Sequence, residues 1–266
     1  MSYEKNENVN FLGVKIDIVN YERAQKIIKN TIDNNHKGYI CVNDVSNVMS
    51  ATQDKALLEA INSSLLSLAD GTPLAWFAKL VGYKEIERIS GMDIMVNQFS
   101  QKDGYRHYLL GDTDSRINRV IEKAKDINSS IQIKGYSPPF KVFDTDDNRF
   151  ILDKLNKEKP DIIWVSFGGG KQEKWMHDNI TNLDRGIMIG VGAAFKWFLG
   201  DLVVPPKILQ RMGLQWLFRF TQMMLFTSPR DMKRAKRALL QRLKFALSFP
   251  REVIKAREEF EIKRNS

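Results

Sequence analysis

The stretch IIWVSFGGGKQEKWMHDNI, residues 162–180, contains the pattern that decides the fold. Its first six residues are apolar except for Ser166, three glycines follow, and the remainder alternates polar and apolar residues at helical spacing. A short apolar run that ends in a turn is typical of a strand buried on both faces. The stretch therefore predicts a strand, a glycine turn and a helix, which is the repeating unit of a parallel α/β sheet.

The same alternation recurs through the first 200 residues. We expect further extended segments at residues 11–19, 39–42, 65–69, 107–110, 131–133 and 187–191. We expect helices at residues 21–32, 115–127, 148–155 and 172–180. This order predicts an α/β fold, a Rossmann-like, largely parallel sheet with helices on both faces. Right-handed crossovers place the strand C-termini along one edge, where ligands usually bind.

The charge of the chain is concentrated at its C-terminal end. The 266 residues carry a formal net charge of +9, with 26 basic and 26 acidic residues in 1–200 against 15 and 6 in 201–266. We interpret residues 1–199 as an α/β catalytic body and residues 200–266 as a helical, basic appendage. A neutral body with a basic appendage predicts an anionic partner: a membrane surface, a nucleic acid or a phosphorylated substrate.

The appendage lacks β-like runs. Pro229 opens a helical pattern in which Met232, Leu239 and Leu243 share one face between basic residues. We expect this face to be buried at a membrane interface or against the body. Its apolar residues could also drive self-association of the chain.

Several classes of protein are disfavoured by composition. Cys41 is the only cysteine, so no intrachain disulfide can form, and the three histidines have no metal-ligand spacing. Residues 1–10 contain no apolar core of a secretory signal, and no run of about 18 apolar residues could span a bilayer. We therefore expect a cytoplasmic protein that meets a membrane only at its surface.

Polar residues at the predicted strand ends are the candidates for chemistry. Asp70, followed by Gly71, would project a carboxylate toward the ligand edge as a proton acceptor, or would cap the next helix. Asn43 could bind substrate or belong to an ordinary turn. The small residues around Gly192 permit either ligand approach or close packing.

The glycine turn at 168–173 is a candidate anion site. Gly168 and Gly170 would let the backbone approach a phosphate, and Gln172 and Glu173 stand at the start of the following helix, whose N-terminus attracts negative charge. The spacing is neither that of a P-loop nor that of the GxGxxG fingerprint. A glycine turn without a ligand remains the alternative.

Two acidic motifs are interpreted as helix caps. Asp112-Thr113-Asp114 has the DxD form of metal-dependent glycosyltransferases, but it directly precedes a predicted helix. Residues 144–147 open another helix in the same way. The sequence thus predicts no metal site.

Taken in order, six segments resemble the WecG/TagA/CpsF glycosyltransferase family over residues 10–235. They are Asn43, Asp70-Gly71, Arg88-Ile89-Ser90-Gly91-Met92-Asp93, Gly170-Lys171-Gln172-Glu173, Gly190 to Phe195, and Leu214-Gln215-Trp216-Leu217-Phe218-Arg219. Cys41 and Lys196 depart from the threonine and aspartate that are usual at these positions.

The resemblance implies an inverting glycosyltransferase that needs neither cofactor nor metal. Such an enzyme moves a HexNAc-type sugar, such as ManNAc, from a UDP-sugar to a polyprenyl-diphosphate-linked saccharide. It works at the inner face of the plasma membrane during surface-polysaccharide or teichoic-acid assembly. Asp70 would be the catalytic base. The implied substrate-binding residues are Cys41, Asn43, Gly71, Arg88, Asp93, Gly168, Gly170, Gln172, Glu173, Gly192, Arg219, Arg230 and Arg234, with the last three closing over the UDP leaving group.

The sequence leaves two other functions as alternatives. A nucleotide-dependent oxidoreductase would require a GxGxxG turn after an early strand, and the sequence contains none. A nucleic-acid- or membrane-binding module would account for the basic appendage. It would leave Asp70 and the glycine turn without a role, and we therefore expect no nucleic-acid partner.

Overall fold

The computed structural model describes residues 6–203, 206, 208–209, 218 and 229–265, and for 229–235 and 237 it describes the backbone alone. Its centre is a six-stranded, entirely parallel sheet with the strand order β4-β3-β8-β7-β5-β6. The strands are β3 (Lys37–Asn43), β4 (Leu66–Ala69), β5 (Arg106–Gly111), β6 (Gln132–Tyr136), β7 (Ile162–Ser166) and β8 (Gly186–Gly190). The predicted parallel α/β fold is confirmed.

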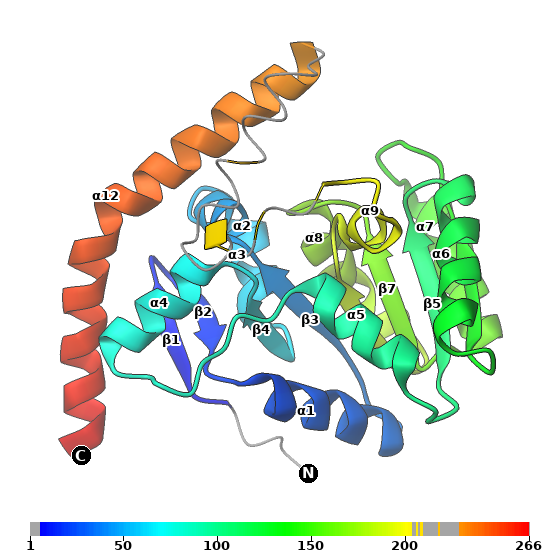
Figure 1. Cartoon of the computed structure of the whole chain (residues 1–266), viewed down its shortest axis with the longest axis horizontal. Coiled ribbons are helices and arrows are strands. Elements are labelled where there is room, and N and C mark those ends of the chain that lie inside the picture. The colour runs from blue at the N-terminus through cyan, green and yellow to red at the C-terminus, as the bar shows by residue number, and fades with distance from the viewer. Residues whose placement is uncertain (1–5, 204–205, 207, 210–217, 219–228, 266) are drawn as a thin grey trace.

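Helices cover both faces of the sheet (Figure 1). One face packs against α1 (Tyr21–Asp33), α5 (Gly91–Ser100), α6 (Asp114–Ile127) and α9 (Ala194–Leu199). The other packs against α2 (Val45–Ala51), α3 (Lys55–Asn62), α7 (Thr145–Glu158) and α8 (Lys171–Asn179), with the short 3-10 helix η1 (Ile180–Asn182) after α8. In β7, Trp164 belongs to the first core and Val165 to the second, which explains why this strand is apolar up to Ser166.

The N-terminal segment differs from its prediction. Residues 11–19 were expected to be one extended segment, but the structure has a hairpin of β1 (Asn8–Phe11) and β2 (Val14–Asp17) that forms a separate antiparallel sheet. Its two-residue turn, Leu12-Gly13, has positive φ at both positions (51° and 91°), as hairpin turns require. The turn cannot be recognised from the sequence, because a leucine such as Leu12 rarely adopts positive φ.

Two helices pack against the hairpin: α4 (Thr72–Val81) and the long C-terminal helix α12 (Pro229–Asn265). The ring of Phe11 in the hairpin meets the ring of Phe77 in α4 edge-on, with 4.8 Å between the ring centroids. It stacks on the ring of Phe245 in α12, with 4.7 Å between the centroids. Figure 1 shows that α12 changes direction along its length, and the helix contains Pro250, which cannot donate a backbone hydrogen bond.

α12 packs on the body mainly through residues outside the predicted face. In that face Leu239 is half-buried, and burial at a membrane interface stays a prediction. Phe245 and Ala256 are buried, with Phe249 beside them, whereas Leu243 is 54% exposed. Met232 lies outside the described side chains. Leu243 therefore does not pack against the body, and its outward orientation leaves it available to another surface. Among the described residues, no helix is both long and apolar enough to cross a membrane.

Candidate active site

A cleft of about 400 Å³ opens at the carboxyl ends of β3, β4 and β8. The turns that follow these strands line it, together with the N-terminal parts of α2, α4, α5, α8 and α9. Seven of the predicted site residues meet there: Asp70, Gly71, Arg88, Asp93, Gln172, Glu173 and Gly192.

Asp70 stands directly after β4 at one wall of the cleft. The N-cap residue of α4 is Gly71, so the carboxylate of Asp70 lies just before a helix N-terminus without being its cap. Arg88 Nη1 lies 3.5 Å from Asp70 Oδ1, and Arg88 Nη2 lies 3.3 Å from Asp93 Oδ2. The arginine thus holds two carboxylates at the rim, and the side chain of Asp70 keeps 35% of its surface exposed.

The segment from Arg88 to Asp93 has its shape for local reasons. Ser90 is the N-cap of α5, where it accepts a hydrogen bond from the backbone N–H of Asp93 at 3.1 Å. Its hydroxyl donates to Asp93 Oδ2 at 2.6 Å. A Cβ atom on Gly91 would lie 3.1 Å from the Cα of Val191, so glycine lets α5 approach the turn after β8 closely.

The glycine turn between β7 and α8 forms a second wall. Gly168 and Gly170 have φ of +89° and +80°, and Gly169 is the glycine that lines the cleft. Gly170 N donates to Glu173 Oε2 at 2.6 Å. Gly168 and Gly170 therefore shape this wall without lining the cleft.

A buried glutamate orients the amide of Gln172. Glu173 is fully buried, and desolvation raises the pKa of its carboxyl group above the ordinary value. Gln172 Nε2 donates to Glu173 Oε1 at 3.0 Å, and Gln172 Oε1 accepts from the N–H of Gly192 at 3.1 Å. Gln172 thus ties the turn after β8 to the start of α8.

Asn43 and Cys41 of β3 do not reach the cleft. Both side chains are 0% exposed, and burial raises the pKa of the Cys41 thiol well above its ordinary value. Neither can contact a substrate in this structure, because neither has accessible surface. Instead, Asn43 Oδ1 accepts a hydrogen bond from Asn47 Nδ2 at 2.7 Å, and Asn47 lines the cleft.

The appendage also contributes to the cleft. Arg242 of α12 is one of its lining residues, and Gln241 Nε2 donates to Ser50 Oγ of α2 at 2.6 Å beside it. Arg219 lies outside the described residues, and the side chains of Arg230 and Arg234 do as well. Sequence reasoning missed Asn47, Trp197 and Arg242 as cleft residues. The position of Asn47, four residues after Asn43, could have indicated it. No local signal distinguishes Arg242 from its basic neighbours.

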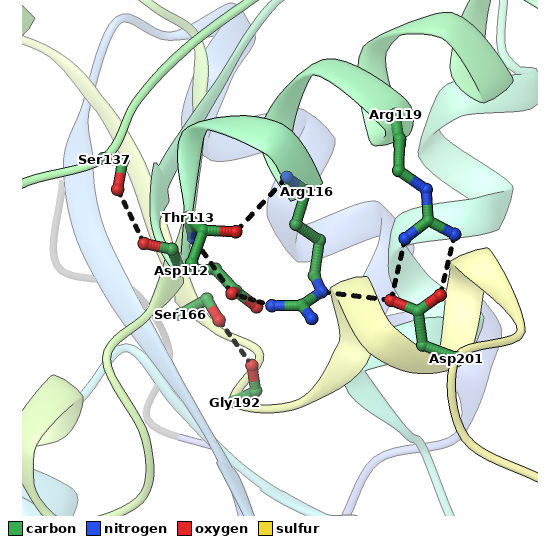
Figure 2. Close-up of polar contacts among 8 residues, drawn as sticks. All are labelled: Asp112, Thr113, Arg116, Arg119, Ser137, Ser166, Gly192 and Asp201. Atoms are coloured by element: carbon green, nitrogen blue, oxygen red, sulfur yellow. Dashed lines mark hydrogen bonds and ion pairs between the residues drawn. The ribbon is translucent and has the colours of Figure 1, made fainter.

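The DxD motif lies elsewhere on the same sheet edge, at the end of β5 (Figure 2). The motif caps α6, as predicted, with Thr113 as the N-cap residue, and the carboxylate of Asp112 pairs with Arg116. Asp201 accepts from Arg116 Nε at 3.1 Å and from Arg119 Nη2 at 2.7 Å. We call Asp112, Arg116, Arg119 and Asp201 the charge cluster. Among the described residues, no group of three or more potential ligands is arranged to hold a metal ion.

The sequence profile of the WecG/TagA/CpsF glycosyltransferase family matches residues 9–259 of the chain. The chain belongs to this family. The order of the motifs around the cleft agrees with this family. The matched region runs from β1 through most of α12.

Curated WecG/TagA/CpsF-type relatives share about a quarter of their residues with the chain. Three of them are 26% identical and carry the name N-acetylglucosaminyldiphosphoundecaprenol N-acetyl-beta-D-mannosaminyltransferase. The protein of Bacillus subtilis strain 168 aligns over 64% of this chain and 66% of its own length. The proteins of Bacillus spizizenii and Staphylococcus aureus strain NCTC 8325 align over 76% and 82% of this chain and over 76% and 87% of their own lengths.

Proposed function

We propose that the protein is an inverting glycosyltransferase that moves a HexNAc-type sugar from a UDP-sugar to a polyprenyl-diphosphate-linked saccharide. ManNAc is the sugar named for the relatives, and we propose it as the donor sugar here. The observation that carries the proposal is one cleft that holds both the Asp70 carboxylate and the glycine turn before α8. A proton acceptor and an anion-binding turn are the two elements that a nucleotide-sugar transfer requires.

Asp70 is the proposed general base. Its carboxylate accepts the proton of an acceptor hydroxyl while that oxygen attacks the anomeric carbon and the bond to the UDP oxygen breaks. Arg88 and the N-terminus of α4 stabilise the ionised carboxylate in the position from which it acts. The reaction then needs no covalent intermediate, and the configuration at the anomeric carbon inverts.

The departing diphosphate needs positive charge. The N-terminus of α8, behind Gly169, presents the positive end of its helix dipole, and Arg242 lines the cleft from α12. We propose that these groups, with Arg219, Arg230 and Arg234 of the appendage, neutralise the leaving group without a metal or another cofactor. Residues 200–266 would thus act as an appendage that completes the site on the body formed by residues 1–199.

The proposed location is the inner face of the plasma membrane. Leu240, Leu243 and Leu247 of α12 are 53%, 54% and 83% exposed, and Lys236 and Lys244 are exposed beside them. An apolar helix face with flanking lysines fits an anionic membrane surface. Replacing Leu243 and Leu247 with serine should weaken binding to phosphatidylglycerol vesicles, and unchanged vesicle binding would contradict this placement.

The reaction is tested by UDP release. The protein is mixed with a polyprenyl-diphosphate GlcNAc acceptor and a panel of UDP-sugars, with a chelator present throughout. We expect acceptor-dependent release with UDP-ManNAc. No release from folded protein with any donor in the panel, with or without Mn²⁺, would contradict the proposed function. Release only with Mn²⁺ would contradict metal independence alone.

A further inference from the structure

A buried chain of hydrogen bonds fixes the direction of the Asn47 amide at the cleft. The chain starts at the backbone carbonyl of Lys15, which accepts a hydrogen bond from Ser67 Oγ at 2.5 Å. A carbonyl oxygen can only accept, so the single hydroxyl proton of Ser67 is used there. Ser67 Oγ must therefore act as an acceptor toward its other partner.

That partner is Asn43. Its Nδ2 donates to Ser67 Oγ at 3.0 Å and also lies 3.4 Å from the backbone oxygen of Cys41. Both neighbours of this atom are acceptors, so it is the nitrogen of the amide. The oxygen of Asn43 consequently points to Asn47 and takes the Nδ2–H of that side chain at 2.7 Å.

Asn47 is left with its Oδ1 directed to the cleft. Within the described part of the chain, no group donates a hydrogen bond to this oxygen, and it is not among the atoms that are sealed from solvent without a partner. A Cβ atom placed on Gly169 would lie 3.5 Å from it. The oxygen therefore faces the glycine turn at which the proposed function places the diphosphate. Because a diphosphate offers only acceptors, a donor to this oxygen must come from the sugar bonded to it.

We infer that Asn47 Oδ1 accepts a hydrogen bond from an N–H or O–H group of the donor sugar, and that Ser67 and Asn43 are positioning residues that keep this oxygen, and not the Nδ2, turned to the sugar. The inference rests on the proposed function. A side chain with a single available acceptor selects sugars that carry a donor at the matching position, because a sugar without one leaves the oxygen desolvated and unpaired. Asn47 is thus a specificity-determining residue of the cleft.

The test compares the affinities for UDP-ManNAc and for UDP alone, measured by isothermal titration calorimetry. Asn47→Ala should weaken UDP-ManNAc binding about tenfold, as expected for one hydrogen bond, and should change the affinity for UDP less than twofold. Ser67→Ala should act in the same direction, since the released Asn43 amide can rotate and turn the Nδ2 of Asn47 toward the cleft. Ser67→Thr keeps the hydroxyl and should restore binding.

Ser64→Ala is the matched control. Ser64 precedes the same strand, and its hydroxyl donates to the Ile61 carbonyl at 2.7 Å without joining the chain to Asn47. We expect it to leave both affinities unchanged. Thermal unfolding of each variant checks folding, and a general loss of structure would lower the affinities for UDP and UDP-ManNAc together.

Equal losses for UDP and UDP-ManNAc in folded Asn47→Ala, or no loss for either, would overturn the inference. An effect confined to the KM of the lipid acceptor would overturn the assignment to the donor sugar. Wild-type protein that binds neither UDP nor UDP-ManNAc would instead overturn the proposed function, so the two failures are distinguishable.

Discussion

The cleft and the charge cluster occupy the same edge of the sheet, and both are built from strand ends followed by helices. They differ in how their charged groups are used. In the charge cluster, Arg116 pairs with the carboxylates of Asp112 and Asp201, and Arg119 also pairs with Asp201 (Figure 2). The hydrogen bonds from Arg119 and Arg116 lower the pKa of Asp201. In the cleft, Arg88 Nη1 lies 3.5 Å from Asp70 Oδ1 at the rim, and both side chains keep about a third of their surface exposed.

This contrast shows why a motif alone misidentifies a site. The DxD motif has the composition of a catalytic centre, yet its first carboxylate is only 7% exposed and is paired with Arg116, four residues further along the chain. The cleft has less conspicuous residues, but they face a common volume of about 400 Å³. We therefore expect the cleft to control turnover and the β5 side of the sheet to control stability.

The largest effect should come from Asp70→Asn. If Asp70 is the general base, its loss should lower kcat about 10²- to 10⁴-fold, while the unfolding temperature stays near that of the wild type. Acceptor-dependent UDP release measures kcat, and Asp114→Asn, which replaces the second aspartate of the DxD motif, is the control. A kcat for Asp70→Asn near the wild-type value would remove the contrast between the two regions.

The second effect concerns stability on the β5 side. His107 of β5 is buried, accepts a hydrogen bond from Trp164 Nε1, and has its pKa lowered to about 4 by desolvation. The unfolded chain binds this proton near pH 6.5 and the folded chain does not, so stability present above pH 6.5 is lost as the pH falls toward 4. The loss should reach about 3 kcal/mol.

Urea unfolding between pH 7.5 and 4 measures this loss. His107→Gln keeps an acceptor for Trp164 but cannot titrate, so its free energy of unfolding should fall less steeply over the same range. Parallel pH profiles for the wild type and the variant would show that another group causes the decline.

The third effect should come from Arg242→Ala in α12. We expect turnover to fall about tenfold, because a charge-assisted contact to the diphosphate is lost. Lys255→Ala, an exposed basic residue of the same helix, is the matched control. Equal rates for the two variants would show that α12 supplies general positive charge and not a specific contact.

The smallest effect should come from Asp112→Asn. Asparagine tolerates the positive φ of 60° at this position, so the change removes the charge without straining the backbone. We expect the free energy of unfolding to drop by about 1 kcal/mol, with kcat within twofold of the wild type. Chemical denaturation and the UDP assay test the two halves separately, and a collapse of kcat would place the DxD motif in the chemistry after all.

Local pattern was sufficient for some of the elements of the fold. The apolar run before Gly168 predicts β7 and the helical spacing after it predicts α8, because both periodicities arise within a few residues of one another. The caps at Thr113 and Asp144 were predictable for the same reason, since an N-cap bonds a backbone N–H three residues away. The Leu12-Gly13 turn was not, since its first residue gives no turn signal.

The sequence by itself determined the parallel α/β sheet, the edge at which the polar strand-end residues lie and the order of the family motifs. Only the tertiary structure decided which side chains reach the cleft. Asn43 ends β3 and Asn47 lies in the first turn of α2, yet packing buries the first and leaves the second at the cleft. Arg242 enters the cleft because α12 docks on the hairpin and α4 through Phe245 and its neighbours. Both outcomes depend on contacts between segments distant in the chain, and such contacts leave no periodic trace in the local sequence.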